Sequence, residues 1–129
     1  MNTILLVEDD PSLIDVYSIT FTHENFRIEV AHDGEECLQK VKTIMPDLIL
    51  LDIMMPEMNG IQALEKLKAD TKTKDIPVLI LSNIAENTYE TRALELGALQ
   101  YLIKSQYLPM DVVNIVKNTL LKNHIDIHT

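Results

Sequence analysis

Residues 48–60 read Leu48-Ile-Leu-Leu-Asp52-Ile-Met-Met-Pro-Glu-Met-Asn-Gly60, and this stretch decides the fold. Its first four residues form an apolar run without polar alternation, which predicts a short strand buried on both faces. Asp52 follows at the end of that strand, and Pro56 and Gly60 then turn the chain. Open α/β folds place their chemistry at the carboxyl ends of strands, so Asp52 is the first candidate functional residue.

Strand and helix patterns alternate along the rest of the chain, without an internal repeat or a low-complexity linker. The alternation predicts right-handed crossovers and a five-stranded parallel sheet with helices on both faces, a doubly wound (βα)5 flavodoxin-like α/β fold. The second strand has the most polar alternation, and we expect it at an edge. The predicted strands are Thr3–Val7, Arg27–Ala31, Asp47–Leu51, Pro77–Leu81 and Leu99–Ile103. The predicted helices are Pro11–His23, Gly34–Ile44, Ile61–Ala69, Asn87–Leu96 and Met110–Lys122.

Length and composition restrict the class of protein. With 129 residues the chain suits one domain, which we place at residues 1–122, followed by a short polar tail at 123–129. No apolar stretch approaches the roughly 20 residues that span a bilayer. A net charge of −9 disfavours a surface that binds nucleic acid. Cys37 is the only cysteine, so no internal disulfide forms, and we expect a cytoplasmic protein.

Polar residues follow the predicted strands at the points where those strands end. Because the carboxyl ends of parallel strands meet at one edge of the sheet, we expect these side chains to lie together. A buried carboxylate is costly unless it is paired with a positive charge or bound to a cation. The sequence therefore predicts a site in which acids face a lysine, made from Glu8, Asp9, Asp52, Ser82 and Lys104.

With these residues in place, the chain resembles the receiver domain of two-component response regulators, the CheY-like family. The resemblance covers residues 3 to about 122 and rests on four short motifs. Each motif alone is a weak signal, but four of them in this order, each at the end of a predicted strand, are specific to the family. They are Leu6-Val7-Glu8-Asp9, the run from Pro46 to Gly60, Ile80-Leu81-Ser82, and the run from Gly97 to Lys104.

The resemblance implies a role for each site residue. Asp52 would accept a phosphoryl group from the phosphohistidine of a histidine kinase or phosphotransfer protein. Ser82 and Lys104 would contact that phosphoryl group. Oxygen ligands of this kind suit Mg²⁺, and we expect Asp9 to bind it directly and Glu8 to act through a water molecule. The implied Mg²⁺ ligands are Glu8, Asp9, Asp52 and the backbone carbonyl of Met54.

The resemblance also implies how the signal leaves the domain. Tyr101 lies three residues before Lys104 on the predicted strand, so the two side chains are expected on opposite faces. Tyr101 and Ser82 would form the switch, and the output face would comprise the helix 87–96, the strand 99–103 and the helix 110–122. We expect a protein target there, and a monomer or a phosphorylation-dependent dimer. The only chemistry implied is self-catalysed transfer and slow self-dephosphorylation, so the protein is not expected to be an enzyme.

Several simpler explanations and alternatives stay open. Asp10 suits a helix cap before Pro11, Ser82 could cap the next helix, and Lys104 could be solvated. A phosphohydrolase with an aspartate nucleophile is disfavoured, because Met54 stands where such enzymes place a second aspartate as general acid. A receiver-like docking module that is never phosphorylated is the other alternative.

Two residues depart from the family pattern. Ser105 replaces the proline that usually follows the lysine. A cis bond before a residue other than proline costs roughly 2.5–4 kcal/mol, so we expect the Lys104–Ser105 peptide to be trans. Asn83 is bulkier than the small residue that usually follows the Ser/Thr, and it puts the lifetime of the phosphoryl group in doubt.

Overall fold

Five parallel strands form the single sheet of this protein, which is described here from a computed structural model covering residues 1–55 and 58–128. The strand order is β2-β1-β3-β4-β5, and every neighbouring pair is parallel. β2 therefore lies at an edge, as its polar alternation predicted. The strands are β1 (Thr3–Val7), β2 (Arg27–Ala31), β3 (Leu48–Leu51), β4 (Val78–Ser82) and β5 (Gln100–Ile103).

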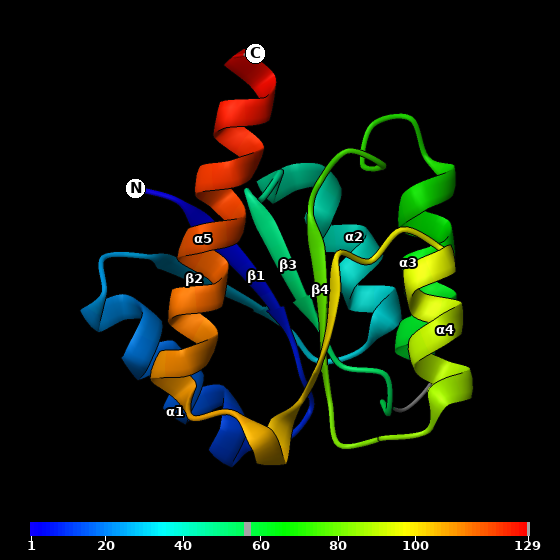
Figure 1. Ribbon diagram of the computed structural model, residues 1–129, viewed down its shortest axis with the longest axis horizontal. Coiled ribbons are helices and arrows are strands. Elements are labelled where there is room, and N and C mark those ends of the chain that lie inside the picture. The colour runs from blue at the N-terminus through cyan, green and yellow to red at the C-terminus, as the bar shows by residue number, and fades with distance from the viewer. Residues whose placement is uncertain (56–57, 129) are drawn as a thin grey trace.

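Helices cover both faces of the sheet (Figure 1). α1 and α5 pack on one face, while α2, α3 and α4 pack on the other. The helices are α1 (Pro11–His23), α2 (Gly34–Ile44), α3 (Gly60–Ala69), α4 (Asn87–Glu95) and α5 (Pro109–His128), with a short 3-10 turn η1 (Lys104–Gln106) before α5. None of the described helices is both long enough and apolar enough to cross a bilayer.

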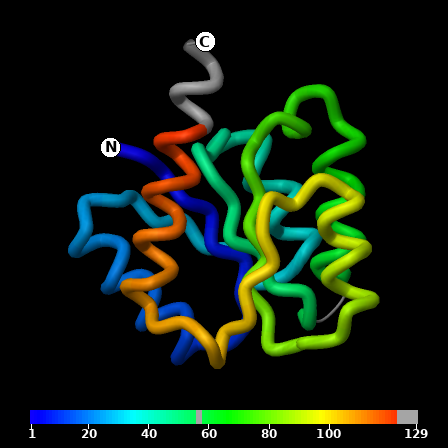
Figure 2. The backbone as a smooth tube through the Cα atoms, viewed as in Figure 1, coloured from blue at the N-terminus to red at the C-terminus, as the bar shows by residue number. Residues whose placement is uncertain are grey.

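The core has two layers because side chains alternate across a strand. In β1, Leu5 and Val7 point into the layer under α2, α3 and α4, while Ile4 and Leu6 point into the layer under α1 and α5. All four residues of β3 are fully buried, which explains their continuous apolar run. Figure 2 shows that the loop after β4 and the turn after β5 lie at the same edge of the sheet.

The element bounds agree closely with the sequence patterns, with one clear exception. β1, β2, α1 and α2 begin and end at the predicted residues, and most other bounds differ by one residue. The exception is α5, which continues to His128, so the prediction that this helix ends at Lys122 was wrong. None of residues 123–128 is Gly or Pro, so nothing in them ends a helix. The predicted turn at Pro56 and the last residue, Thr129, lie outside the described residues.

Gly60 places the start of α3 directly against the backbone of the loop that follows Asp52. Its N–H donates to the carbonyl of Ile53 at 2.8 Å. A Cβ atom at this position would lie 2.1 Å from the backbone oxygen of Asp52 and 2.8 Å from the Cα of Ile53. Both neighbours are backbone atoms, so they cannot move aside as a flexible side chain would. Only glycine therefore lets α3 begin this close to Asp52.

We expect Gly60→Ala to lower the free energy of unfolding by about 1–3 kcal/mol, because the added methyl group overlaps buried backbone. Urea unfolding followed by circular dichroism measures this change. Gln62→Ala is the control: it lies in the same turn and removes only the hydrogen bond that its side chain accepts from Asn59 N–H. Equal loss of stability in the two variants would show that the close approach at Gly60 is unimportant.

Candidate functional site

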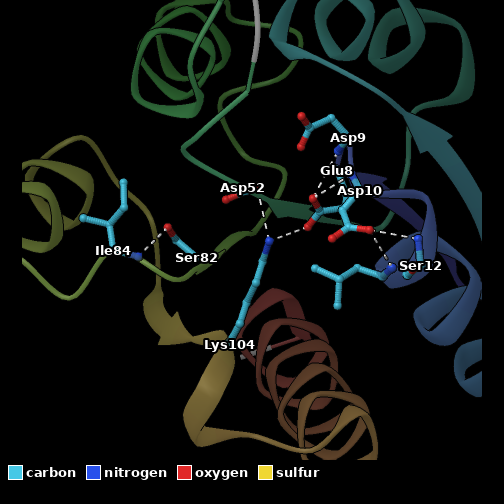
Figure 3. A network of polar contacts seen from close by, with 9 residues as sticks. Glu8, Asp9, Asp10, Ser12, Asp52, Ser82, Ile84 and Lys104 are labelled. Carbon is cyan, nitrogen blue, oxygen red and sulfur yellow. Dashed lines mark hydrogen bonds and ion pairs between the residues drawn. The ribbon is translucent and has the colours of Figure 1, made fainter.

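The polar residues that follow the strands gather at the carboxyl edge of the sheet, as predicted (Figure 3). Glu8 follows β1, Asp52 follows β3, Ser82 ends β4, and Lys104 begins the turn after β5. Glu8, Asp52 and Ser82 are buried. β1, β3 and β4 are neighbours in the sheet, so topology alone brings the ends of these strands together.

Lys104 lies between two buried carboxylates. Its Nζ is 2.5 Å from Glu8 Oε1 and 3.2 Å from Asp52 Oδ2. The side chain of Lys104 is only 9% exposed, and those of Glu8 and Asp52 are 2% and 7% exposed. The pairing of Lys104 with Asp52 was predicted, but its shorter contact with Glu8 was not. Lys104 is therefore not a solvated lysine.

Glu8 is held through its second carboxylate oxygen as well. The backbone N–H groups of Asp9 and Asp10 donate to Glu8 Oε2 at 3.1 and 3.2 Å. Asp10 itself caps α1, because its side chain accepts from Ser12 N–H at 2.9 Å. The predicted cap at Asp10 is thus confirmed. Glu8 and Asp10 therefore have different structural roles: Glu8 contacts Lys104, and Asp10 caps α1.

Three carboxylates of the site fit a divalent cation. One oxygen from each of Glu8, Asp9 and Asp52 lies within 4.8 Å of the others. Carboxylate oxygens are the hard ligands that Mg²⁺ prefers. Asp9 is exposed, whereas Glu8 and Asp52 are buried, so the cluster opens to solvent on the side of Asp9.

The surroundings of the site raise the pKa values of both Asp52 and Lys104. Burial raises the pKa of Asp52 to about 6, and the negative charge of Glu8 adds to this, although Lys104 opposes it. Burial alone would lower the pKa of Lys104, but the hydrogen bond and charge of Glu8 together with the charge of Asp52 raise it. Lys104 therefore stays protonated, and the site destabilises the charged form of Asp52.

Ser82 is fully buried, and its hydroxyl faces the loop after β4. Ser82 Oγ accepts a hydrogen bond from Ile84 N–H at 3.1 Å. The explanation of Ser82 as a helix cap was wrong, because α4 begins at Asn87 with Glu86 as its capping residue. The loop from Asn83 to Glu86 separates Ser82 from the helix, which leaves the hydroxyl free of that role.

Tyr101 is linked to Ser82 through a single residue of that loop. The hydroxyl of Tyr101 donates to the backbone carbonyl of Ile84 at 2.6 Å. The half-buried ring packs in the core layer on the α4 side. Burial raises the pKa of the Tyr101 hydroxyl, which remains a hydrogen-bond donor. Sequence analysis missed Ile84, because both contacts use its backbone and no side-chain pattern reveals them.

Ser105 and Asn83 are the two residues that depart from the family pattern. The Lys104–Ser105 peptide is trans, which confirms the prediction. The chain enters the η1 turn directly at Lys104, and Ser105 is exposed. Asn83 is also exposed, at the rim of the site next to Ser82.

Comparison with known proteins gives one consistent family. Residues 4–117 match the response regulator receiver domain. The DNA-binding response regulator MtrA of Mycolicibacterium smegmatis is 37% identical over 120 residues, which cover 93% of this chain and 51% of MtrA. RpaA of Synechocystis, a DNA-binding transcriptional regulator, is 34% identical over 87% of this chain and 45% of its own length. The chain thus spans about half the length of these relatives.

Solved structures agree with this match. A CheY-like receiver domain from Methanospirillum hungatei has a TM-score of 0.91 and 25% identity over 98% of each chain. The BeF3-activated receiver domain of RstA from Klebsiella pneumoniae has a TM-score of 0.83 and 25% identity, over 92% of this chain and 98% of its own. These likenesses favour a receiver domain over a phosphohydrolase or a docking module that is never phosphorylated.

The raised pKa of Asp52 makes stability depend on pH. The folded protein binds this proton more tightly than the unfolded chain, so the resulting stabilisation is full below pH about 4 and is lost as the pH rises through about 6. Asn carries no ionisable proton. We therefore expect Asp52→Asn to gain stability over the parent between pH 4 and pH 8, by on the order of 2 kcal/mol.

Urea unfolding in EDTA at the two pH values tests this expectation. Asp15→Asn, on the exposed side of α1, is the control and should show no such gain. If the free energies of unfolding of Asp52→Asn and the parent differed by the same amount at both pH values, the Asp52 carboxylate would not have a raised pKa in the folded protein.

Proposed function

The chain belongs to the response regulator receiver domain family, and we propose that Asp52 is its phosphoacceptor, supplied by a phosphohistidine donor. The observation that carries this proposal is the Asp52 carboxylate, buried at the end of a central strand and 3.2 Å from Lys104. The raised pKa of Asp52 also marks a carboxylate that its surroundings do not stabilise as an ion, which is typical of functional sites.

The proposed reaction transfers one phosphoryl group. A carboxylate oxygen of Asp52 attacks phosphorus, the P–O bond forms, and the P–N bond of the donor breaks, so that imidazole leaves. This transfer needs positioning and charge stabilisation more than a separate base. Lys104 would neutralise one phosphoryl oxygen, and Ser82 would donate its hydroxyl proton to another. Reaction of the acyl phosphate with water would end the signal, without turnover of any other substrate.

Mg²⁺ is the cation that this donor set fits best. Asp9, Asp52 and the backbone carbonyl of Met54 would hold it, with Glu8 close by. When bound, it would supply positive charge that screens the three carboxylates from the incoming phosphoryl group. Asp9 is the exposed member of the cluster and the one best placed to meet a cation from solvent.

We place the receiver domain at residues 1–122 and the tail at residues 123–129. We also place the protein in the cytoplasm. Its donor would be a histidine kinase or a phosphotransfer protein. Its net charge of −9 argues against direct nucleic-acid binding by this domain. Relatives named as DNA-binding regulators are about twice as long as this chain, so DNA binding in a longer protein would belong to another part.

The proposed output is a protein target bound at the face made by α4, β5 and α5, by a monomer or a phosphorylation-dependent dimer. When Ser82 turns toward the phosphoryl group, its hydrogen bond to Ile84 N–H would break. The carbonyl of the same residue accepts from Tyr101, so a shift of this loop would move the ring and α4 together. Hydrogen bonds of this kind each contribute about 0.5–1.5 kcal/mol, which is enough to bias two nearly equal states.

Incubation with a small-molecule phosphodonor and Mg²⁺ should add one phosphoryl group, detected by intact mass. Asp52→Asn should block this addition, because the nucleophile is gone, and EDTA should suppress it, because three close carboxylates then repel the donor. Asp10→Asn is the control: it removes a neighbouring charge but keeps a capping side chain. Unchanged labelling in Asp52→Asn would refute the phosphoacceptor role.

Tyr101→Phe should weaken the link between the site and α4, because only the hydrogen bond to the Ile84 carbonyl is lost. We expect a phosphoryl mimic to shift the amide NMR signals of residues 84–96 in the parent, and to shift them less in the variant. Tyr89→Phe, a similar change on α4, is the control. Equal shifts in all three proteins would exclude Tyr101 from the switch.

A further inference from the structure

The two ends of α4 are held differently, and its first end has few fixed contacts. Glu86 precedes the helix, and within the described part of the chain its side chain makes no capping hydrogen bond. The apolar side chains at this end, Ile84 and Tyr89, pack against the core but are only half-buried. The hydroxyl of Tyr101 adds one hydrogen bond, to the Ile84 carbonyl. A small shift of this end would therefore break few buried contacts.

The other end of α4 is closed and buried. Gly97 follows the helix with a φ of +113°, a conformation that favours glycine. Its N–H donates to the Leu94 carbonyl at 3.1 Å, and the N–H of Ala98 donates to the Ala93 carbonyl at 3.0 Å. Ala93 and Ala98 are both buried. The last turn of α4 is thus paired within the chain and packed against the core.

Lys68 reaches this end of α4 from α3, which lies beside α4 on the same face of the sheet (Figure 1). A Cβ atom at Gly97 would lie 3.3, 3.4 and 3.5 Å from the Cε, Cδ and Cγ atoms of Lys68, so the lysine methylenes cover the glycine. Lys68 Nζ donates to the carbonyls of Lys74 at 2.9 Å and Ile76 at 3.0 Å. One side chain therefore joins the end of α3, the segment before β4 and the end of α4.

The contacts of Lys68 are stronger than the other polar link between α3 and α4. Both of its hydrogen bonds start from an ammonium group, and such charge-assisted bonds are about twice as strong as neutral ones. Lys68 is half-buried, so water competes less for them. Arg92 of α4 also pairs with Glu65 of α3 at 3.2 Å, but both of these side chains are more than half exposed. Exposed ion pairs contribute little, because water and salt screen them.

We infer that Lys68 is a positioning residue of the switch: it fixes the C-terminal end of α4, which then acts as a pivot. This role rests on the proposed function, because the movement that it limits would begin at Ser82 and Ile84. A shift of the loop after β4 would turn α4 about its anchored end instead of carrying the whole helix along. Residues 84–91 of the output face would then change position, while residues 93–98 would stay in place.

Amide hydrogen exchange, measured by NMR without any phosphodonor, tests the anchor. Lys68→Met keeps most of the apolar chain that covers Gly97 but removes the ammonium group and its two hydrogen bonds. We expect exchange of residues 93–98 to accelerate about tenfold relative to the amides of β3, which report on unfolding of the whole domain. Lys66→Met, at an exposed lysine of the same helix, is the matched control and should leave this ratio unchanged.

Beryllofluoride, a phosphoryl mimic, tests the pivot when it is added with Mg²⁺. In the parent, the amide NMR shifts should be large for residues 84–91 and small for residues 93–98. In Lys68→Met this difference should shrink, because the far end of α4 is no longer held. A lysine that only stabilised the fold would leave the distribution of shifts unchanged. The comparison within the parent needs no substitution, so it decides even if Lys68→Met does not fold.

Two results would overturn the inference. One is a shift of residues 93–98 in the parent as large as that of residues 84–91, and the other is equal hydrogen exchange of residues 93–98 in Lys68→Met and Lys66→Met. Failure of the proposed function looks different. If beryllofluoride changed no signal in the parent, the phosphoacceptor role of Asp52 would be contradicted, and hydrogen exchange would still decide whether Lys68 anchors α4.

Discussion

The site is organised around one buried ammonium group shared by two buried carboxylates. Removing three charges from water is costly, and only close pairing with good hydrogen bonds offsets that cost. Lys104 meets this condition through Glu8 and Asp52, and two backbone N–H groups complete the partners of Glu8. Burial, and after it the negative charge of Glu8, raises the pKa of Asp52 in spite of Lys104, so a cation or a protonated carboxyl is the natural complement of the site.

The rest of the fold keeps these groups together. Parallel strands deliver Glu8, Asp52 and Ser82 to one edge, and the two core layers fix the strands from both sides. Gly60 then lets α3 begin directly against the backbone of Asp52 and Ile53. Strands and helices therefore place the charges, while the loop after β4 meets both Ser82 and Tyr101 through the backbone of Ile84.

Much of this arrangement is predictable from the sequence, because it depends on the type of residue at each position along the chain. Apolar runs located the strands, and polar residues at their ends located Asp52 and Lys104. The contact of Lys104 with Glu8 could not be predicted in the same way, because residue type does not tell which of the two neighbouring acids, Glu8 or Asp9, meets the lysine. The role of Ile84 was missed because its two hydrogen bonds use the backbone, which residue type does not reveal. The length of α5 was missed because no Gly or Pro marks where the helix ends.

In the proposed switch, Ile84 would connect the site to α4. Ser82 and Tyr101 both use the backbone of this residue, one its N–H and the other its carbonyl, so neither contact depends on the side chain. If Ser82 exchanged its hydrogen bond to Ile84 for one to a phosphoryl oxygen, the peptide groups on either side of Ile84 would shift together. α4 is suited to follow, because Ala93 is its only buried residue and its first turn has no side-chain cap among the described residues. One charge-assisted contact contributes about 1.5–3 kcal/mol, which would be enough to bias two nearly equal positions of this helix in the proposed switch.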